Sequence, residues 1–258
     1  MSAARHAVAV KIHGGDPPPR GGLARGTASQ PRVGLAQWRR AGTFLLDLAL
    51  PATCVGCGRE GAPICRACLP ALAVREEAPA GIPIGLPSDV PEPLLQLEWC
   101  APFGGLVRRA LHDLKYAGEQ RLAEPLGAAI ADRWRRAGAG GDLIVHVPVH
   151  ADRSRERGYD QAEALARVTA RELRLPQIPA LVRERATIAQ FQLGRGRRAA
   201  NVAGAFRPDG PAGRAVAGRW VVLIDDVVTT GATLVACADA LLEAGAVGVS
   251  AVTVARER

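Results

Sequence analysis

The stretch from Trp220 to Thr233, WVVLIDDVVTTGAT, decides the fold that this sequence predicts. Its apolar run, Val221 to Ile224, does not alternate between apolar and polar residues, which favours a strand buried on both faces of a parallel sheet. Two aspartates follow the run, and a threonine-rich turn with one glycine then opens a helical pattern. The order of strand, loop and helix predicts an α/β fold with a ligand site at the carboxyl end of the strand.

The residue types of this loop indicate a site for a phosphorylated sugar. Gly231 allows the backbone to approach a ligand closely, and the amides at the start of the next helix are donors for a phosphate. Asp225 and Asp226 would repel phosphate, so they suit ribose hydroxyls or a Mg²⁺ ion that bridges sugar and pyrophosphate oxygens. The alternative is a buried strand with an acidic helix cap and no ligand. The coincidence of strand, acid pair and glycine turn in one register favours the ligand site.

The stretch resembles the phosphoribosyl pyrophosphate (PRPP) signature of type I phosphoribosyltransferases. The resemblance implies that the two acids, as the catalytic pair, bind the ribose 2′ and 3′ hydroxyls and that the Thr-Thr-Gly-x-Thr turn wraps the 5′-phosphate. The PRPP-binding residues are then Asp225, Asp226, Val228, Thr229, Thr230, Gly231, Ala232 and Thr233.

Length and composition are consistent with one α/β domain and a small appendage. The chain has 258 residues, of which 48% are hydrophobic, and this content excludes wholesale disorder. The net charge of +8 suits polyanionic ligands and equally suits an arginine-rich solvated surface. The apolar run from Thr43 to Leu50 carries Asp47 and is too short to span a bilayer. We therefore expect a cytoplasmic protein without membrane insertion.

Four of the six cysteines form two closely spaced C-x-x-C pairs, Cys54 with Cys57 and Cys65 with Cys68. Two such pairs can present four thiolates tetrahedrally to one metal ion, and structural zinc is the expected occupant. Disulfides are the alternative, but a cytoplasmic chain disfavours them, and redox chemistry would need only one pair. A ribbon with so small a core would depend on the metal to fold.

The composition divides the chain into four parts. Residues 1–34 are rich in Gly, Pro and Arg and are expected to be disordered. Residues 35–75 hold an amphipathic helical pattern followed by the zinc ribbon. Residues 76–97 are rich in Pro and Gly and predict a linker. Residues 98–258 form the phosphoribosyltransferase-like domain, in which strands alternate with helices.

Two arginine-rich segments are candidates for binding pyrophosphate or forming a hood over the site. In type I enzymes the loop after the first strand cradles pyrophosphate, and the matching segment here is Val149 to Gly158. The region 183–207 has neither a helical nor a strand period, which predicts a long functional loop. Solvated arginines are the alternative in both places. The candidate residues are Arg153, Arg155, Arg157, Arg185, Gln190, Arg198 and Asn201.

A closer resemblance joins these features. The cysteine ribbon, the Leu114-Lys115-Tyr116 segment, the RGYDQA segment that begins at Arg157, the R-x-T-x-x-Q loop and the PRPP signature are together similar to the ComF family of competence-associated proteins. The similarity covers residues 42–257. It implies a zinc ribbon, PRPP bound with Mg²⁺, and a link to DNA uptake in naturally transformable bacteria.

The resemblance leaves three functions open. One is transfer of a phosphoribosyl group from PRPP to an unidentified acceptor. Salvage of 6-oxopurines is disfavoured because Thr229 stands where those enzymes have an aspartate, and no ammonia from glutamine is expected because the chain begins Met1-Ser2. The second is a single-stranded DNA-binding accessory of the DNA-uptake proteins, with a regulatory or vestigial PRPP site. The third is a PRPP sensor without catalysis.

Overall fold

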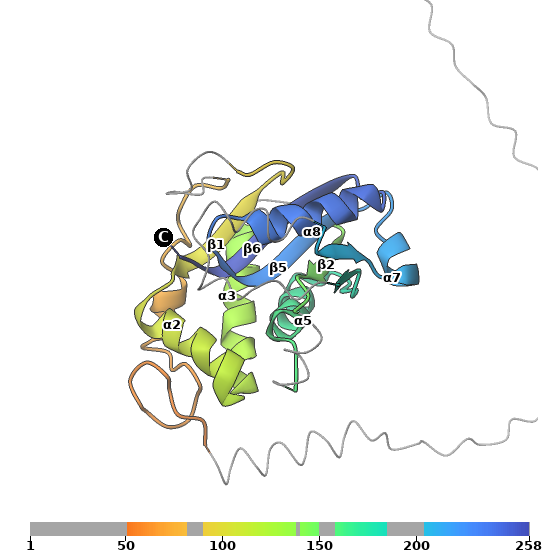
Figure 1. Ribbon diagram of the computed structural model, residues 1–258. Coiled ribbons are helices and arrows are strands. Elements are labelled where there is room, and N and C mark those ends of the chain that lie inside the picture. Colours follow the sequence, from red (N-terminus) through yellow and green to blue (C-terminus); the bar gives the residue numbers. More distant parts are fainter. Residues whose placement is uncertain (1–50, 82–89, 138–139, 150–157, 185–203, 258) are drawn as a thin grey trace, which may run out of the picture. The chain divides into compact units, whose positions relative to one another are not determined.

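Four parallel strands form the central sheet of the computed structural model, in the order β1-β6-β5-β2 (Figure 1). They are β1 (Leu97–Pro102), β2 (Leu143–His146), β5 (Trp220–Val228) and β6 (Gly248–Arg256). The structure describes residues 51–81, 90–137, 140–149, 158–184 and 204–257. The expected parallel sheet is confirmed, and the strand of the signature lies inside it.

Strand β5 is longer than its apolar run. It pairs with β2 on one side and β6 on the other, and the register with β6 continues from Trp220 through Val228. The two aspartates are therefore part of the strand, with Asp225 opposite Thr253 of β6. The apolar run Val221 to Ile224 is completely buried, as its lack of alternation predicts.

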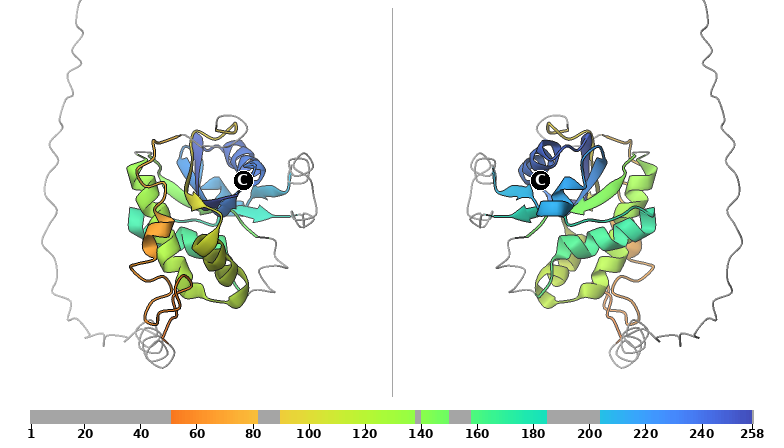
Figure 2. Two further views of the ribbon diagram at one scale, coloured as in Figure 1. Left: turned by 90° about the vertical axis from the view of Figure 1, so that its left-hand side faces the viewer. Right: turned by 90° about the vertical axis from the view of Figure 1, so that its right-hand side faces the viewer.

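Helices cover both faces of the sheet. Helices α2 (Gly105–His112), α3 (Ala123–Arg136) and α5 (Gln161–Leu173) share a core with Val222 and Ile224 of β5. Helix α8 (Ala232–Glu243) shares the other core with Val221 and Leu223. Figure 2 shows α8 on the opposite side of the sheet from α3 and α5. Successive strand residues thus point into different cores, as expected for a strand between two helical layers.

The remaining described elements are short. The turns η1 (Leu69–Leu72) and η3 (Gln120–Leu122) are 3₁₀-helical, η2 (Asp113–Ala117) is a π-helical turn, and α7 (Gly210–Arg214) is one short helix. Strands β3 (Leu181–Arg183) and β4 (Phe206–Pro208) form an antiparallel ribbon. The region 183–207, for which no regular structure was expected, thus begins and ends in strands. Among the described residues, no helix is long and apolar enough to cross a bilayer.

A buried ion pair fastens the chain after the cysteine cluster to the sheet. Glu98 of β1 is fully buried and accepts hydrogen bonds from Arg133 of α3, from Nε at 2.9 Å and from Nη2 at 2.5 Å. The Arg133 guanidinium also donates to the carbonyl oxygens of Arg75, at 2.7 Å, and Ala78, at 2.8 Å. One side chain therefore holds three separate parts of the chain together, and its charge is neutralised where it lies.

Candidate functional site

The signature loop lies in a cleft of about 830 Å³ at the carboxyl ends of the strands. This is where ligands bind in open α/β sheets. The segment after β2 and the turn η2 form other parts of its wall. All of the PRPP-binding residues expected from the sequence line this cleft, namely Asp225, Asp226, Val228, Thr229, Thr230, Gly231, Ala232 and Thr233.

The turn before α8 has the backbone geometry of an anion site. Gly231 adopts φ +83°, a conformation that residues with a Cβ atom rarely adopt. A Cβ atom at this position would also lie 3.1 Å from Cγ of Pro91. The Ala232 amide, the first of α8, donates to Oγ1 of Thr230 over 3.4 Å. The first amides of α8 lie at the cleft, where the positive end of the helix dipole favours a phosphate.

The acid pair is held by its own backbone. One carboxylate oxygen of Asp225 accepts from the Asp226 amide at 2.8 Å, and one oxygen of Asp226 accepts from the Val227 amide at 2.9 Å. Burial raises the pKa of Asp225 well above its usual value, and repulsion by the neighbouring Asp226 adds to the rise. Asp225 therefore holds a proton more readily than an aspartate in water does.

Lys115 is the site residue that the sequence did not assign. It lies on η2, and its ammonium group forms an ion pair with Oδ2 of Asp226. Burial acts to lower the pKa of Lys115, but the charge and hydrogen bond of Asp226 outweigh it and leave the pKa raised. The only sequence signal was the Leu114-Lys115-Tyr116 segment, which carried a family resemblance but no role.

We expect Asp225→Asn to raise stability at neutral pH. The raised pKa means that the folded protein binds this proton more tightly than the unfolded chain does. Ionisation of Asp225 therefore costs stability from about pH 4 upward, the usual range of an aspartate in an unfolded chain. At pH 7 the variant should gain about 1 kcal/mol, or roughly 2 to 4 °C in Tm.

Thermal unfolding of wild type and Asp225→Asn between pH 4 and pH 8 measures this difference. The gain should shrink towards pH 4, where the wild-type carboxyl is protonated. Asp226→Asn should instead lower Tm at pH 7, because it leaves the largely buried Lys115 without its anion. Equal Tm values for wild type and Asp225→Asn at pH 7 would contradict the interpretation.

The segment after β2 enters the same cleft. Asp160 caps α5 by accepting from the Ala162 and Glu163 amides, and its other oxygen accepts from the Val149 amide at 3.0 Å. This second bond ties the start of the expected pyrophosphate loop to α5. The sequence analysis did not single out Asp160, although an aspartate before a helical pattern is a recognisable cap.

None of the arginines expected to bind pyrophosphate or form a hood is among the described residues. The pyrophosphate and hood candidates Arg153, Arg155, Arg157, Arg185, Gln190, Arg198 and Asn201 lie outside the described residues. Arg183, at the end of β3, does line the cleft, and its guanidinium carbon lies 5.3 Å from the ring centre of Phe206. Both tyrosines of the chain, Tyr116 and Tyr159, line the cleft as well.

The four ribbon cysteines converge on one point. The four Sγ atoms all lie within 4.8 Å of one another, and none of the four cysteines forms a disulfide. The residues are Cys54, Cys57, Cys65 and Cys68. The Cys57 and Cys65 sulfurs are 3.6 Å apart. Tetrahedral zinc with bonds of about 2.3 Å separates its sulfurs by roughly 3.8 Å. The cluster is therefore compatible with a structural zinc.

The electrostatics of the cluster also suit a cation. Burial acts to raise the pKa of Cys54, but hydrogen bonds from the Cys65, Cys57 and Gly56 amides lower it to about 6. Burial and hydrogen bonds to the other three cysteines raise the pKa of Cys68 to about 12. Without a bound cation, the cluster favours ionisation of the Cys54 thiol and disfavours ionisation of the Cys68 thiol. A metal ion would remove this competition by neutralising all four.

The cluster packs directly on α2. Arg109 of α2 donates to the carbonyl oxygens of Val55 and Gly56, over 3.2 and 3.4 Å. A Cβ atom at Gly56 would lie 2.5 Å from Cδ1 of Leu106 and 2.7 Å from Sγ of Cys68, so a larger residue here would have to displace these side chains. Helix α2 runs on without a break into η2, which carries Lys115.

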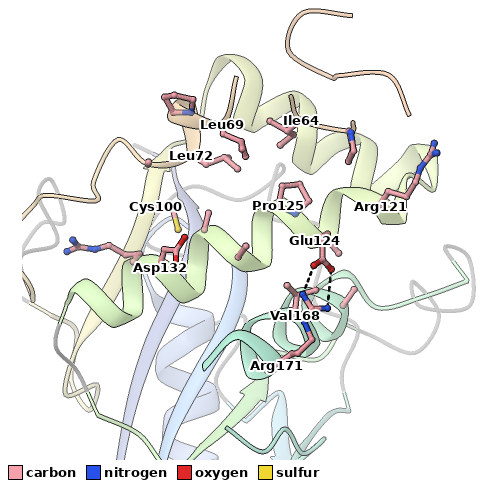
Figure 3. Close-up of a pocket in the computed structure, with 18 of the residues that line it drawn as sticks. Ile64, Leu69, Leu72, Cys100, Arg121, Glu124, Pro125, Asp132, Val168 and Arg171 are labelled. Carbon is pink, nitrogen blue, oxygen red and sulfur yellow. Dashed lines mark hydrogen bonds and ion pairs between the residues drawn. The ribbon is translucent and has the colours of Figure 1, made fainter. Parts of the chain in front are cut away.

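A second hollow, of about 1040 Å³, lies away from the signature loop (Figure 3). Ile64, Leu69 and Leu72 lie on one side of it and Pro125 of α3 on the other. Much of its lining is apolar, and the Arg171 ion pair with Glu124 lies at its edge. None of its lining residues is a residue of the first cleft.

The parallel sheet, the acid pair and glycine turn at the end of β5, and the cysteine cluster together define a class of protein. The chain is an α/β protein in which helices flank a four-stranded parallel sheet and a four-cysteine cluster precedes the sheet in sequence. It belongs to the family of the DNA utilization protein YhgH, the ComF family. Relatives of known sequence establish this membership, although no family model matches the chain.

The YhgH protein of Escherichia coli strain K12 is 32% identical over 174 residues, which cover 65% of this chain and 75% of the relative. That of Salmonella typhimurium strain LT2 is 30% identical over 202 residues, covering 76% of this chain and 85% of the relative. Among solved structures, the glutamine PRPP amidotransferase from B. subtilis complexed with ADP and GMP is 24% identical, with a TM-score of 0.34. That match covers 50% of this chain and 25% of the amidotransferase.

Proposed function

We propose that this protein binds PRPP in the cleft at the end of β5 and transfers its phosphoribosyl group to an acceptor. One observation carries the proposal: the acid pair and the first amides of α8 line the same cleft at the carboxyl edge of the sheet. A 5′-phosphate at the helix start would place the sugar hydroxyls within reach of the acids.

The chemistry proposed for the site is mainly electrostatic. The bond between C1 of the ribose and the pyrophosphate breaks, and positive charge develops on the sugar. Asp225 and Asp226 would hold the ribose and favour that charge, and the amides of α8 would hold the phosphate. Mg²⁺ bound to pyrophosphate would neutralise the leaving group. The zinc that we propose for the cysteine cluster is structural and takes no part in this step.

Replacing both acids with asparagine should weaken PRPP binding at least about tenfold. The substitution keeps the size of the side chains and removes their charge. Charge-assisted hydrogen bonds contribute roughly 1.5 to 3 kcal/mol each, and about 1.4 kcal/mol corresponds to a factor of ten. Calorimetric titration of wild type and Asp225→Asn/Asp226→Asn with PRPP and Mg²⁺ measures the change.

The matched control is Asp239→Asn, which removes an exposed aspartate farther along α8 and should leave PRPP affinity unchanged. Ribose 5-phosphate should bind wild type more weakly than PRPP, because it lacks the pyrophosphate. A wild type that does not bind PRPP, or a double variant that binds it equally well, would refute the proposed function and leave the fold unaffected.

Direct contact with single-stranded DNA is the second candidate function. The curated relatives are called DNA utilization proteins, and the net charge of +8 suits a polyanion. Titration of a single-stranded oligonucleotide at low and physiological salt separates the two candidates. Binding that falls steeply with salt supports DNA contact, and absence of binding even at low salt eliminates it.

A further inference from the structure

The acid pair already has a cation supplied by the chain. Lys115 reaches the pair from η2, which lies between α2 and α3 and far from the signature in sequence. The Lys115 side chain is 22% exposed and that of Asp226 is 9% exposed, so this ion pair is largely shielded from water. All three residues of the group, Lys115, Asp225 and Asp226, line the cleft.

Three of the four carboxylate oxygens of the pair already have a partner in the chain. Oδ1 of Asp225 and Oδ1 of Asp226 each accept from a backbone amide. Oδ2 of Asp226 is held by the Lys115 ammonium. A Mg²⁺ ion shared by two carboxylates needs an oxygen from each at about 2.0 to 2.1 Å, in near-octahedral geometry. An ion in that position would meet the ammonium group, and the like charges would repel.

The protonation of Lys115 and Asp225 limits the net negative charge of the three side chains. The raised pKa of Lys115 keeps the ammonium charged at neutral pH. The raised pKa of Asp225, caused by burial and by Asp226, works against a second full negative charge. The three side chains together therefore carry at most one net negative charge, which attracts a divalent cation less than two unpaired carboxylates do.

We propose that Lys115 is the resident cation of the acid pair and determines which ligands the cleft accepts. The pair does not hold a free divalent cation; it receives the hydroxyls of a phosphorylated sugar, and Mg²⁺ enters only on a ligand that carries its own pyrophosphate. The sugar phosphate as ligand rests on the proposed function above. The exclusion of a free divalent cation rests on the ion pair alone.

Binding of Mn²⁺ to the zinc-loaded, full-length protein tests the exclusion without any sugar ligand. Mn²⁺ has coordination preferences close to those of Mg²⁺, and its free fraction is measured by electron paramagnetic resonance. Wild type and Asp226→Asn should therefore bind the same amount of Mn²⁺. Lys115→Met should gain one, with an affinity at least about tenfold above that of wild type, and the further change Asp226→Asn should abolish it.

Lys115→Arg is the matched control, because it keeps the positive charge and should bind Mn²⁺ no better than wild type. If Lys115→Met does not fold, Lys115→Gln and the wild-type measurement still decide the matter. A Mn²⁺ site in wild type that is lost in Asp226→Asn overturns the proposal. So does a folded Lys115→Met protein that gains no site.

A second titration tests whether excluding a free divalent cation affects the binding of a sugar phosphate. The affinity of wild type for ribose 5-phosphate should change by less than about threefold when Mg²⁺ is added. In Lys115→Met the affinity should rise at least about tenfold with Mg²⁺. Wild-type affinity that depends strongly on Mg²⁺ would overturn the proposal. If ribose 5-phosphate and PRPP both fail to bind wild type, the proposed function is wrong, while the Mn²⁺ result still decides the role of Lys115.

Discussion

Cys65→Ser should abolish zinc binding by the four-cysteine cluster. Purified wild type should contain about one zinc per chain, and the variant close to none, because a hydroxyl is a poor substitute for a thiolate ligand. The sulfurs of the cluster are close enough together to bind one ion. Binding energies of structural zinc are about 10 to 16 kcal/mol, so loss of the ion should unfold the segment that holds the cluster.

Elemental analysis measures the zinc content, and proteolysis between residues 54 and 68 reports the loss of structure. Cys100→Ala is the control, since Cys100 is buried in β1 outside the cluster and the variant should keep its zinc. Wild type purified without zinc, or a Cys65→Ser protein with a full complement, would show that the cluster is not a zinc site.

Arg133→Met should destabilise the fold by about 3 to 5 kcal/mol. The substitution removes the guanidinium that donates two hydrogen bonds to the fully buried carboxylate of Glu98, and leaves as its cation the more distant Arg75, whose Nη2 is 3.8 Å from Oε2. It also removes the donors to the carbonyl oxygens of Arg75 and Ala78. Urea denaturation of wild type and variant gives the difference in the free energy of unfolding.

Arg135→Met is the matched control on the same helix. The Arg135 side chain is 46% exposed and pairs with Asp132 at the surface, so its loss should cost about 0 to 1 kcal/mol. Adding Glu98→Gln to Arg133→Met should restore part of the stability, because it removes a buried charge that has lost its hydrogen-bonded cation. If both arginine variants lose the same free energy of unfolding, the buried ion pair stabilises the fold no more than the surface pair does.

The sequence predicted the parts of the fold whose pattern is local. The apolar run at Val221 to Ile224 identified β5, and the helical pattern after the glycine turn identified α8. Strand β1 was missed because it contains Glu98, a charge that is acceptable in a buried strand only beside cations such as Arg75 and Arg133. Strands β3 and β4 were missed because three residues are too few to show a period.

In the candidate site, too, the sequence predicted the local features and missed those that depend on contacts between distant residues. The loop from Thr229 to Thr233 is continuous in sequence, so its chemistry could be read from residue types. Lys115 could not be found in this way, because its partner Asp226 belongs to a distant part of the chain. A contact between such residues depends on how helices and sheet pack together. A single sequence gives no measure of that packing.

The helix that links the cysteine cluster to the acid pair constrains how this family can vary. Helix α2 touches the cluster through Leu106 and Arg109, and η2 presents Lys115 to Asp226. Inserting one residue between these contacts would turn Lys115 by about 100° around the helix axis and move it by about 1.5 Å. In evolutionary terms, the number of residues between the two contacts should change less than their identity. Insertions and deletions in an alignment of relatives should therefore fall outside this helix.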